Sequence, residues 1–250
     1  MYFFVLNFIR NWELMIDKIM HRTKFQFITF SILSTLSAST AYTQPTTLIV
    51  VRKFKIYREL VVADSSKKMV ELKTIVPNLR YDLRYATGNN FLHQRLYKKG
   101  NETFLRLPVA KALATAQQEL NEKGFGLKIW DAYRPYSVTV KMWEPIKDDR
   151  YVADPKKGSG HNRGTAVDLA IINLKDGKEL NMGTDFDNFS DTAHQTFTNL
   201  PEEILQNRLL LKSTMEKYGF VALATEWWHF YWKDANKFEL MDIDFKKFRK

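Results

Sequence analysis

The sequence contains no cysteine among its 250 residues. This absence excludes disulfide bonds, thiolate metal ligands, a cysteine nucleophile and a lipoprotein anchored through a modified cysteine. Any metal site must therefore be built from histidine, aspartate and glutamate side chains. Histidine is scarce too, with five residues in the chain: His21, His93, His161, His194 and His229.

Acidic residues are outnumbered by basic ones, and the formal net charge is +10 at pH 7. The lysines and arginines are spread along the chain without a long basic run, and no nucleic-acid-binding motif is present. We therefore expect no nucleic-acid partner, and we attribute the charge to a solvated surface suited to an anionic cell wall. The 45% hydrophobic and 26% charged residues indicate a globular protein.

The N-terminus has an apolar stretch that is too short to cross a membrane comfortably. Residues 25–38 are apolar, Arg22 and Lys24 precede them, and small residues ending at Ala41 follow. This is the layout of a secretory signal peptide, whereas a membrane span needs about 20 apolar residues. We expect an exported, periplasmic or secreted protein, cleaved after Ala41 and without stable membrane insertion. A retained apolar anchor is the alternative.

Hydrophobic periodicity predicts a single α+β domain over residues 70–250, after an N-terminal extension with the signal peptide (1–41) and an approach segment (42–69). Long helices are expected where proline lies near the start and glycine near the end of a helical pattern. The expected helices are 107–126, a shorter one ending before Pro145, and 200–220; the expected strands are 72–87, 127–133, 166–174 and 221–232. They predict a mostly antiparallel central sheet flanked by helices.

The motif "SGHNRGTAVD" (159–168) contains one histidine and one carboxylate in a tight glycine-containing loop. Asp168 lies in an apolar strand, where a buried carboxylate is costly unless it is paired or bound to a cation. The loop can bring His161 back toward Asp168. A structural salt bridge is the alternative for Asp168.

The motif "EWWH" (226–229) repeats this combination in a strongly apolar, aromatic segment. In a flat strand Glu226 and His229 would face opposite sides, so both can reach one metal only at a bulge or strand end. The alternatives are an arginine partner for Glu226 and a core position for His229. Two histidines, one carboxylate ligand and a second carboxylate as general base are the layout of a catalytic zinc site.

The motif "DAYRP" (131–135) places Arg134 just past the end of a buried strand. A guanidinium fixed near a hydrolytic metal can stabilise an oxyanion or clamp a carboxylate. A surface arginine, or one paired with Asp131, is the alternative.

Together these motifs resemble the zinc D-alanyl-D-alanine dipeptidases, the VanX type. The pattern Ser-x-His-x-x-Gly-x-Ala-x-Asp followed by Glu-x-x-His is shared with D,D-carboxypeptidases, L-alanyl-D-glutamate endopeptidases and the Hedgehog domain. The stretches "LRYATGNNF" (83–91), "DAYRP" and "MGTDFDNF" (182–189), in this order, favour the dipeptidases. The resemblance covers roughly residues 70–240 and implies the zinc D-Ala-D-Ala peptidase or Hedgehog-like fold.

The resemblance also implies the roles of individual residues. It implies one zinc ion per chain, held by His161, Asp168 and His229. It implies Glu226 as the base that activates water and protonates the departing amine, and Arg134 as the partner of the oxyanion.

The same resemblance implies how a small dipeptide substrate is held. Ser159 would contact the substrate carboxylate, and Asp187 with Tyr85 would hold its free ammonium group. The chain departs from the family pattern at Leu92-His93, where Thr-Gly is common, so His93 is either a local specificity feature or a surface residue.

The expected reaction is hydrolysis of D-alanyl-D-alanine to two D-alanines. A D,D-carboxypeptidase or L,D-endopeptidase acting on peptidoglycan stem peptides is the nearest alternative. A non-catalytic envelope-binding protein of the same fold is a third, but a pure binder needs neither a base such as Glu226 nor an oxyanion partner such as Arg134.

Overall fold

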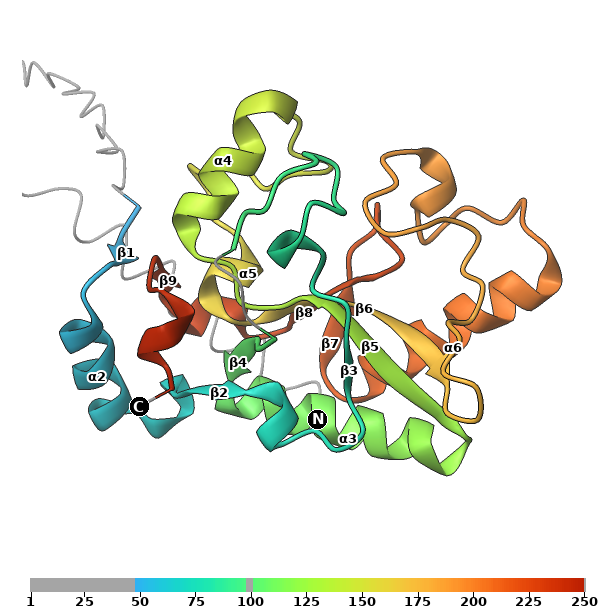
Figure 1. Cartoon of the computed structure of the whole chain (residues 1–250), viewed down its shortest axis with the longest axis horizontal. Coiled ribbons are helices and arrows are strands. Elements are labelled where there is room, and N and C mark those ends of the chain that lie inside the picture. Colours follow the sequence, from blue (N-terminus) through green and yellow to red (C-terminus); the bar gives the residue numbers. More distant parts are fainter. Residues whose placement is uncertain (1–47, 98–100, 250) are drawn as a thin grey trace, which may run out of the picture. The chain divides into compact units, whose positions relative to one another are not determined.

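A five-stranded sheet forms the centre of the computed structural model, which describes residues 48–97 and 101–249 (Figure 1). Within this sheet only β3 and β5 run parallel; the other neighbouring strands are antiparallel. The strand order is β3 (Arg80–Tyr81), β5 (Phe125–Asp131), β6 (Ala166–Asn173), β8 (His229–Trp232) and β7 (Phe220–Ala222). The predicted α+β class with a mostly antiparallel central sheet is confirmed.

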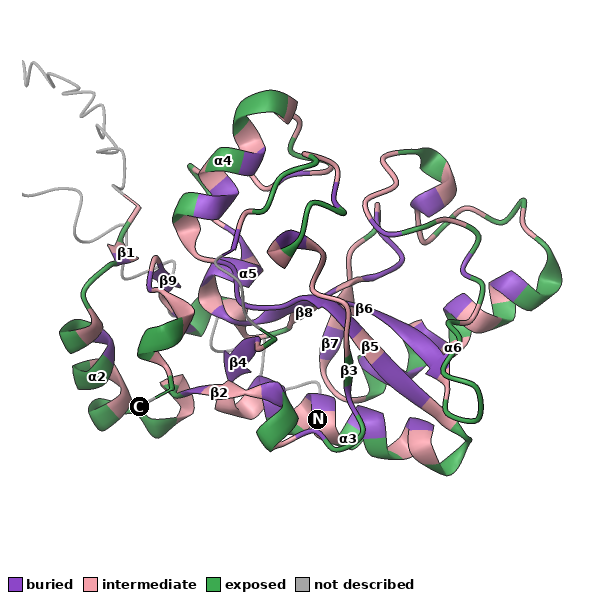
Figure 2. Ribbon diagram, in the orientation of Figure 1, coloured by how far each residue is buried: buried purple, intermediate pink, exposed green. Residues whose placement is uncertain are grey.

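Two long helices, α3 (Leu107–Glu122) and α6 (Glu202–Lys217), pack against each other and against the sheet. The helical spacing of apolar residues in α3 places Val109, Leu113 and Leu120 on one fully buried face. Proline lies in the first turn of α3, where its missing N–H removes no helical hydrogen bond. Figure 2 shows buried residues along β5 and β6 and exposed residues on the outer faces of both helices.

Helices α4 (Tyr136–Ile146) and α5 (Gly160–Arg163) lie in the connection between β5 and β6. The prediction that α4 ends before Pro145 is wrong, because the helix continues through this proline to Ile146. Pro145 has no N–H to donate to the carbonyl four residues earlier, and the helix ends one residue after it. Lys147, in the left-handed conformation, then ends the helix by donating its N–H to the Trp143 carbonyl.

Two of the expected strands differ from the structure. Most of 72–87 is irregular, with only β3 extended between two single 3-10 turns. The segment 221–232 is not one strand but β7 and β8, paired antiparallel and joined by the turn 223–228. The aromatic run in this segment reads as a strand from composition, but Trp227 and Trp228 are buried in the turn instead of alternating between two faces.

The described residues before Val70, expected to be an approach segment, pack against the rest of the structure. β1 (Val50–Val51) pairs with β9 (Leu240–Met241), and β2 (Met69–Glu71) pairs with β4 (Phe104–Arg106). Between them, α2 (Phe54–Ala63) buries Tyr57 in a second apolar cluster with the following members: Val51, Met69, Phe104, Tyr133, Met241 and Ile243. Packing therefore extends upstream of the expected boundary at residue 70.

The predicted signal peptide, residues 1–41, lies outside the described residues. Within 48–97 and 101–249, none of the helices has the length and apolar character needed to traverse a bilayer.

The short helix α5 ends at Gly164, which adopts a left-handed conformation with φ of 69°. A Cβ atom there would lie 2.6 Å from Cε and 2.7 Å from Sδ of the buried Met69. The Gly164 carbonyl also accepts a hydrogen bond from the Arg106 backbone N–H at 2.8 Å, which fixes this turn on β4. The left-handed conformation favours glycine at this position, and an added Cβ would force the end of the buried Met69 side chain to move.

We expect Gly164→Ala to lower the free energy of unfolding by about 2–4 kcal/mol, because left-handed strain adds to overpacking against Met69. Gly177→Ala is the matched control, since Gly177 has φ of 74° but nothing within 4 Å of its added Cβ. Denaturant unfolding of both variants separates packing from strain. Equal losses in the two variants would contradict the steric account.

Candidate metal centre

Strand pairing places three polar residues side by side at one level of the sheet. Asp131 at the end of β5 is the cross-strand partner of Asp168 on β6, and Asp168 is the partner of His229 on β8. A register irregularity between Ile129 and Asp131 sets the first of these pairs. Directly opposite residues in antiparallel strands project to the same face. The sheet therefore gathers two carboxylates and an imidazole that are far apart in the sequence.

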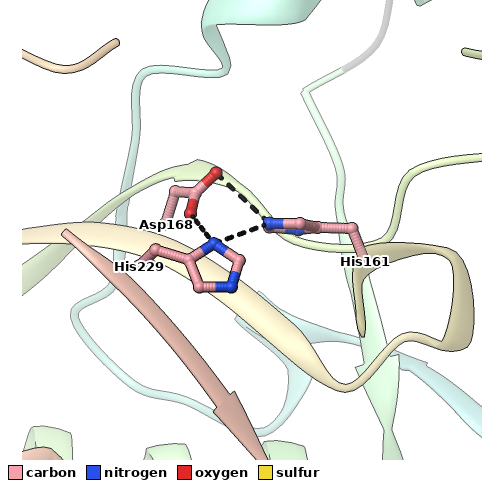
Figure 3. Close-up of side chains that lie close together, drawn as sticks. All are labelled: His161, Asp168 and His229. Atoms are coloured by element: carbon pink, nitrogen blue, oxygen red, sulfur yellow. Dashed lines mark hydrogen bonds and ion pairs between the residues drawn. The ribbon is translucent and has the colours of Figure 1, made fainter. Parts of the chain in front are cut away.

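Helix α5 adds His161 to this row (Figure 3). Its Nε2 lies 3.2 Å from Nδ1 of His229 and 3.4 Å from Oδ2 of Asp168. His229 Nδ1 in turn lies 2.9 Å from Oδ1 of Asp168. The structure thus brings together the three predicted ligands. Each offers one atom that could bind a metal, and these atoms lie close to one another.

Backbone contacts fix the orientation of His161. Its Nδ1 lies 2.7 Å from the carbonyl oxygen of Ala132. A carbonyl only accepts, so Nδ1 carries the hydrogen and Nε2 presents its lone pair to the cluster. The Ser159 hydroxyl caps α5 by accepting the His161 N–H at 3.2 Å, and the Asn162 side chain accepts the Ser159 N–H at 3.1 Å. These contacts preorganise one side of the centre.

The charges of the cluster suit a cation. Burial alone would raise the pKa of Asp168, but the neighbouring His161 and His229 hold the pKa of this carboxyl below its ordinary value. Burial lowers the pKa of His229, against the opposing effect of Asp168, and so favours the neutral imidazole. An ionised carboxylate and neutral imidazoles are the protonation states that bind metals.

Arg134 is both paired with Asp131 and directed at the centre. Its Nε donates to Oδ2 of Asp131 at 2.9 Å, and its Nη2 lies 2.8 Å from the same oxygen and 3.8 Å from Oδ2 of Asp168. The pairing with Asp131, considered as an alternative from the sequence, therefore coexists with a position at the site. The charge-assisted hydrogen bond and the ion pair to one carboxylate hold the guanidinium in place.

Asp131 and Tyr97 support this arginine, and the sequence did not identify them as site residues. The Tyr97 hydroxyl donates to Oδ1 of Asp131 at 2.7 Å, and Asp131 is only 1% exposed. Burial raises the pKa of Asp131, while the charge of Arg134 opposes the shift. The sequence could have indicated Asp131, because it is a carboxylate at the end of a predicted buried strand. Nothing in the local sequence indicates that Tyr97 belongs to the site.

Glu226 lies in the turn before β8, not in a central strand. From there its Oε2 comes within 3.9 Å of His229 Nδ1, so both side chains reach the same place. Burial raises the pKa of Glu226 well above its ordinary value, and the negative charges of Asp168 and Asp187 add to the rise. A carboxyl group with a raised pKa beside a metal site is suited to take up and return a proton.

Asp187 and Tyr85 form the far side of the site. The Tyr85 hydroxyl donates to Oδ1 of Asp187 at 2.9 Å. Asp187 has φ of 59°, a strained backbone conformation for a residue with a side chain. Its Oδ2 is buried and has no hydrogen-bond partner within the described residues. A buried carboxylate oxygen left unpaired beside a cavity indicates a place for a cationic ligand group.

The site contains one cavity of about 310 Å³. The eight site residues expected from the sequence all line it: Tyr85, Arg134, Ser159, His161, Asp168, Asp187, Glu226 and His229. His93 is exposed and does not line this cavity, so the structure does not place it at the site.

The chain matches a known protein family and several named relatives. Residues 65–250 match the peptidase M15 family described as D-ala-D-ala dipeptidase. A D-alanyl-D-alanine dipeptidase of Escherichia coli K12 is 34% identical over 181 residues, which cover 72% of this chain and 93% of that protein. One from Enterococcus faecium is 31% identical over 186 residues, covering 65% of this chain and 90% of that protein.

Among solved structures, the LD-carboxypeptidase LdcB is similar with a TM-score of 0.38 and 20% identity. The similarity covers 68% of this chain and 71% of that one.

The geometry predicts that His161→Ala loses most of its bound divalent metal, because one of three ligands is removed. The protein is stripped with a chelator and titrated with Zn²⁺ or Co²⁺, and metal content per chain is measured together with the melting temperature. Metal binding should raise the melting temperature of the wild type but not of His161→Ala. His93→Ala is the control, and equal metal content in the two variants would refute the assignment.

The environment of Asp187 predicts a pH-dependent cost in stability. Burial first of all, and then the charge of Asp168, raise the pKa of Asp187 to about 7, against the opposing hydrogen bond from Tyr85. The unfolded value is about 3.9, so the folded protein binds the extra proton between these values and loses stability as pH rises toward 7.

We therefore expect Asp187→Asn in metal-free protein to become more stable relative to the wild type as pH rises from about 4 to 8. Denaturant unfolding at a series of pH values measures this difference. A difference that stays constant with pH, or changes in the opposite direction, would contradict the raised pKa.

Proposed function

The chain belongs to the M15 family of D-Ala-D-Ala dipeptidases, and from this premise we propose that it hydrolyses D-alanyl-D-alanine to two D-alanines with one zinc ion. The observation that carries the proposal is the convergence of eight side chains on one cavity. They comprise a set of metal ligands, a base, a fixed guanidinium and groups for both charged ends of a dipeptide. The curated relatives named as this enzyme match over about nine-tenths of their length.

The donor set fits zinc. Zinc in catalytic sites takes three protein ligands at about 2.0–2.2 Å, which in tetrahedral geometry lie about 3.3 Å from one another. His161 Nε2 lies 3.2 Å from His229 Nδ1, and each of these nitrogens lies within 3.4 Å of one oxygen of Asp168. One ligand atom from each of the three residues can be chosen so that all lie within 4.8 Å of one another. When bound there, zinc supplies Lewis acidity toward a carbonyl oxygen and lowers the pKa of water.

Glu226 acts as general base and then as general acid in this proposal. Its carboxylate takes a proton from the attacking water as the new C–O bond forms at the scissile carbonyl. It then delivers that proton to the amine nitrogen as the C–N bond breaks, so that no net proton is lost. The raised pKa of Glu226 favours the protonated state needed for the second step.

Arg134 stabilises the negative charge that develops on the carbonyl oxygen. Because Asp131 holds the guanidinium before substrate arrives, little reorganisation is needed during the reaction. The Tyr97 hydroxyl keeps Asp131 in place on its other oxygen. Asp131 and Tyr97 are therefore positioning residues that act through Arg134.

The ammonium and carboxylate ends of the dipeptide bind to different side chains of the cavity. The ammonium group pairs with Asp187, whose buried Oδ2 would otherwise have no partner among the described residues. The substrate carboxylate accepts a hydrogen bond from the Ser159 hydroxyl, whose oxygen is already engaged by the His161 N–H. A substrate this small depends on its charged ends for orientation.

The same feature argues against a carboxypeptidase acting on stem peptides. In a stem peptide the nitrogen of the penultimate D-alanine is part of an amide and has no positive charge. Asp187 would then face an uncharged group in a buried place, which is unfavourable. Purified zinc-loaded protein offered D-Ala-D-Ala and a pentapeptide with the same terminal pair distinguishes the two functions. Cleavage of the pentapeptide would overturn the proposal.

We expect Glu226→Ala to lower kcat for D-Ala-D-Ala by about 10²–10⁴-fold while bound zinc stays at the wild-type level. Glu226 is assigned to proton transfer and not to metal binding, so metal content and activity should separate. Steady-state kinetics and metal analysis are run in parallel, with Glu203→Ala on the exposed start of α6 as the control. A fully active Glu226→Ala variant would disprove the mechanism.

A further inference from the structure

Three aromatic side chains from three separate loops meet at the edge of the cavity. Phe189 stacks on Tyr151, with ring centroids 4.8 Å apart and planes at 26°, and contacts Phe91 edge-on at 5.2 Å. Phe91 and Tyr151 line the cavity, whereas Phe189 joins them without lining it. We name Phe91, Phe189 and Tyr151 the aromatic bridge.

The aromatic bridge belongs to a partly exposed part of the site. All three rings belong to partly exposed residues, whereas His161 and Asp168 are only 2% and 3% exposed. The nearby lining residues Arg150 and Lys157 are exposed to solvent.

The bridge adjoins the ammonium end of the proposed substrate. Phe91 contacts the ring of Tyr85 edge-on at 6.3 Å, and the Tyr85 hydroxyl holds Asp187. Phe189 follows Asp187 by two residues along the chain. The bridge therefore lies next to the place where a residue added at the N-terminus of the substrate would begin.

The loop that carries Tyr151 is also fixed to the turn that carries Glu226. The Thr225 hydroxyl donates to the backbone carbonyl of Arg150 at 3.1 Å. The Arg150 guanidinium lies 5.2 Å from the centroid of the Tyr151 ring and donates to Asp148 at 2.6 Å. The bridge is therefore held at both ends by contacts outside the three rings.

We propose that the aromatic bridge restricts the substrate to a dipeptide by closing the route past its ammonium group. The proposal rests on the dipeptidase function proposed above and assigns its length limit to three residues other than the metal ligands and Glu226. Phe189 is the central member, because both ring contacts depend on it.

The test is Phe189→Ala in the zinc-loaded protein, which removes both ring contacts without altering a residue that lines the cavity. We measure kcat/KM for D-Ala-D-Ala and for Gly-D-Ala-D-Ala. The ratio of tripeptide to dipeptide activity should rise by about tenfold or more, since specificity against one additional group is typically of this size. Phe189→Tyr, which keeps the ring, should retain the wild-type ratio.

Phe54→Ala is the matched control. Phe54 is also partly exposed, stacks on Tyr57 with centroids 5.5 Å apart at 26°, and contacts Phe248 edge-on at 6.5 Å. It lies on α2, away from the residues that line the cavity. Loss of its ring contacts should leave the tripeptide-to-dipeptide ratio unchanged, so a rise in this variant would show a general loosening instead of a local effect.

Calorimetric binding of both peptides to zinc-loaded protein with Glu226→Ala, with and without Phe189→Ala, separates the two proposals. If the wild type binds D-Ala-D-Ala without cleaving it, the dipeptidase function is contradicted but the role of the bridge is not. The length limit is then measured as the ratio of tripeptide to dipeptide affinity. Tripeptide use by the wild type, an unchanged ratio in Phe189→Ala, or binding of neither peptide overturns the role of the bridge. If Phe189→Ala does not fold, Phe189→Leu replaces it.

Discussion

The pairing of Asp131 with Asp168 on adjacent strands is the constraint on which the site depends. Both carboxylates are almost fully buried, and two neighbouring negative charges in such a place are stable only with compensating cations. Arg134 contacts both of them, and a ring nitrogen of His161 lies within 3.6 Å of each. The positions of the arginine and the histidine follow from the charges that the sheet register has placed together, and a divalent cation would complete the compensation.

Two further carboxyl groups, those of Glu226 and Asp187, add to the acidic character of the cavity. Glu226 and Asp187 both have raised pKa values, in each case from burial first and then from the charge of Asp168. Asp187 also has a left-handed backbone conformation. Its Oδ2 has no hydrogen-bond partner among the described residues. Such features lower the stability of the empty protein and are relieved by a metal and an ammonium group, which is the usual relation between stability and function at an active site.

The clustering of His161, Asp168 and His229 with Glu226 was predictable, because each motif is short and carries polar groups into apolar surroundings. The route by which Glu226 reaches the site was not, since the aromatic run around Trp227 reads as a strand and is a turn. Tyr97 and Asp131 lie 34 residues apart, and their contact depends on the register irregularity in β5. No local pattern reports such a contact, because tertiary packing alone brings the residues together.

Chemistry and substrate length are assigned to different parts of the fold. The metal ligands lie on β6, β8 and α5, whose positions are fixed by strand pairing and by buried hydrogen bonds. The aromatic bridge comes from loops, which tolerate substitution better than paired strands do. Loop substitutions can therefore change which peptides enter without moving the ligands or Glu226. A dipeptide limit built from ring contacts alone is for this reason separable from hydrolysis.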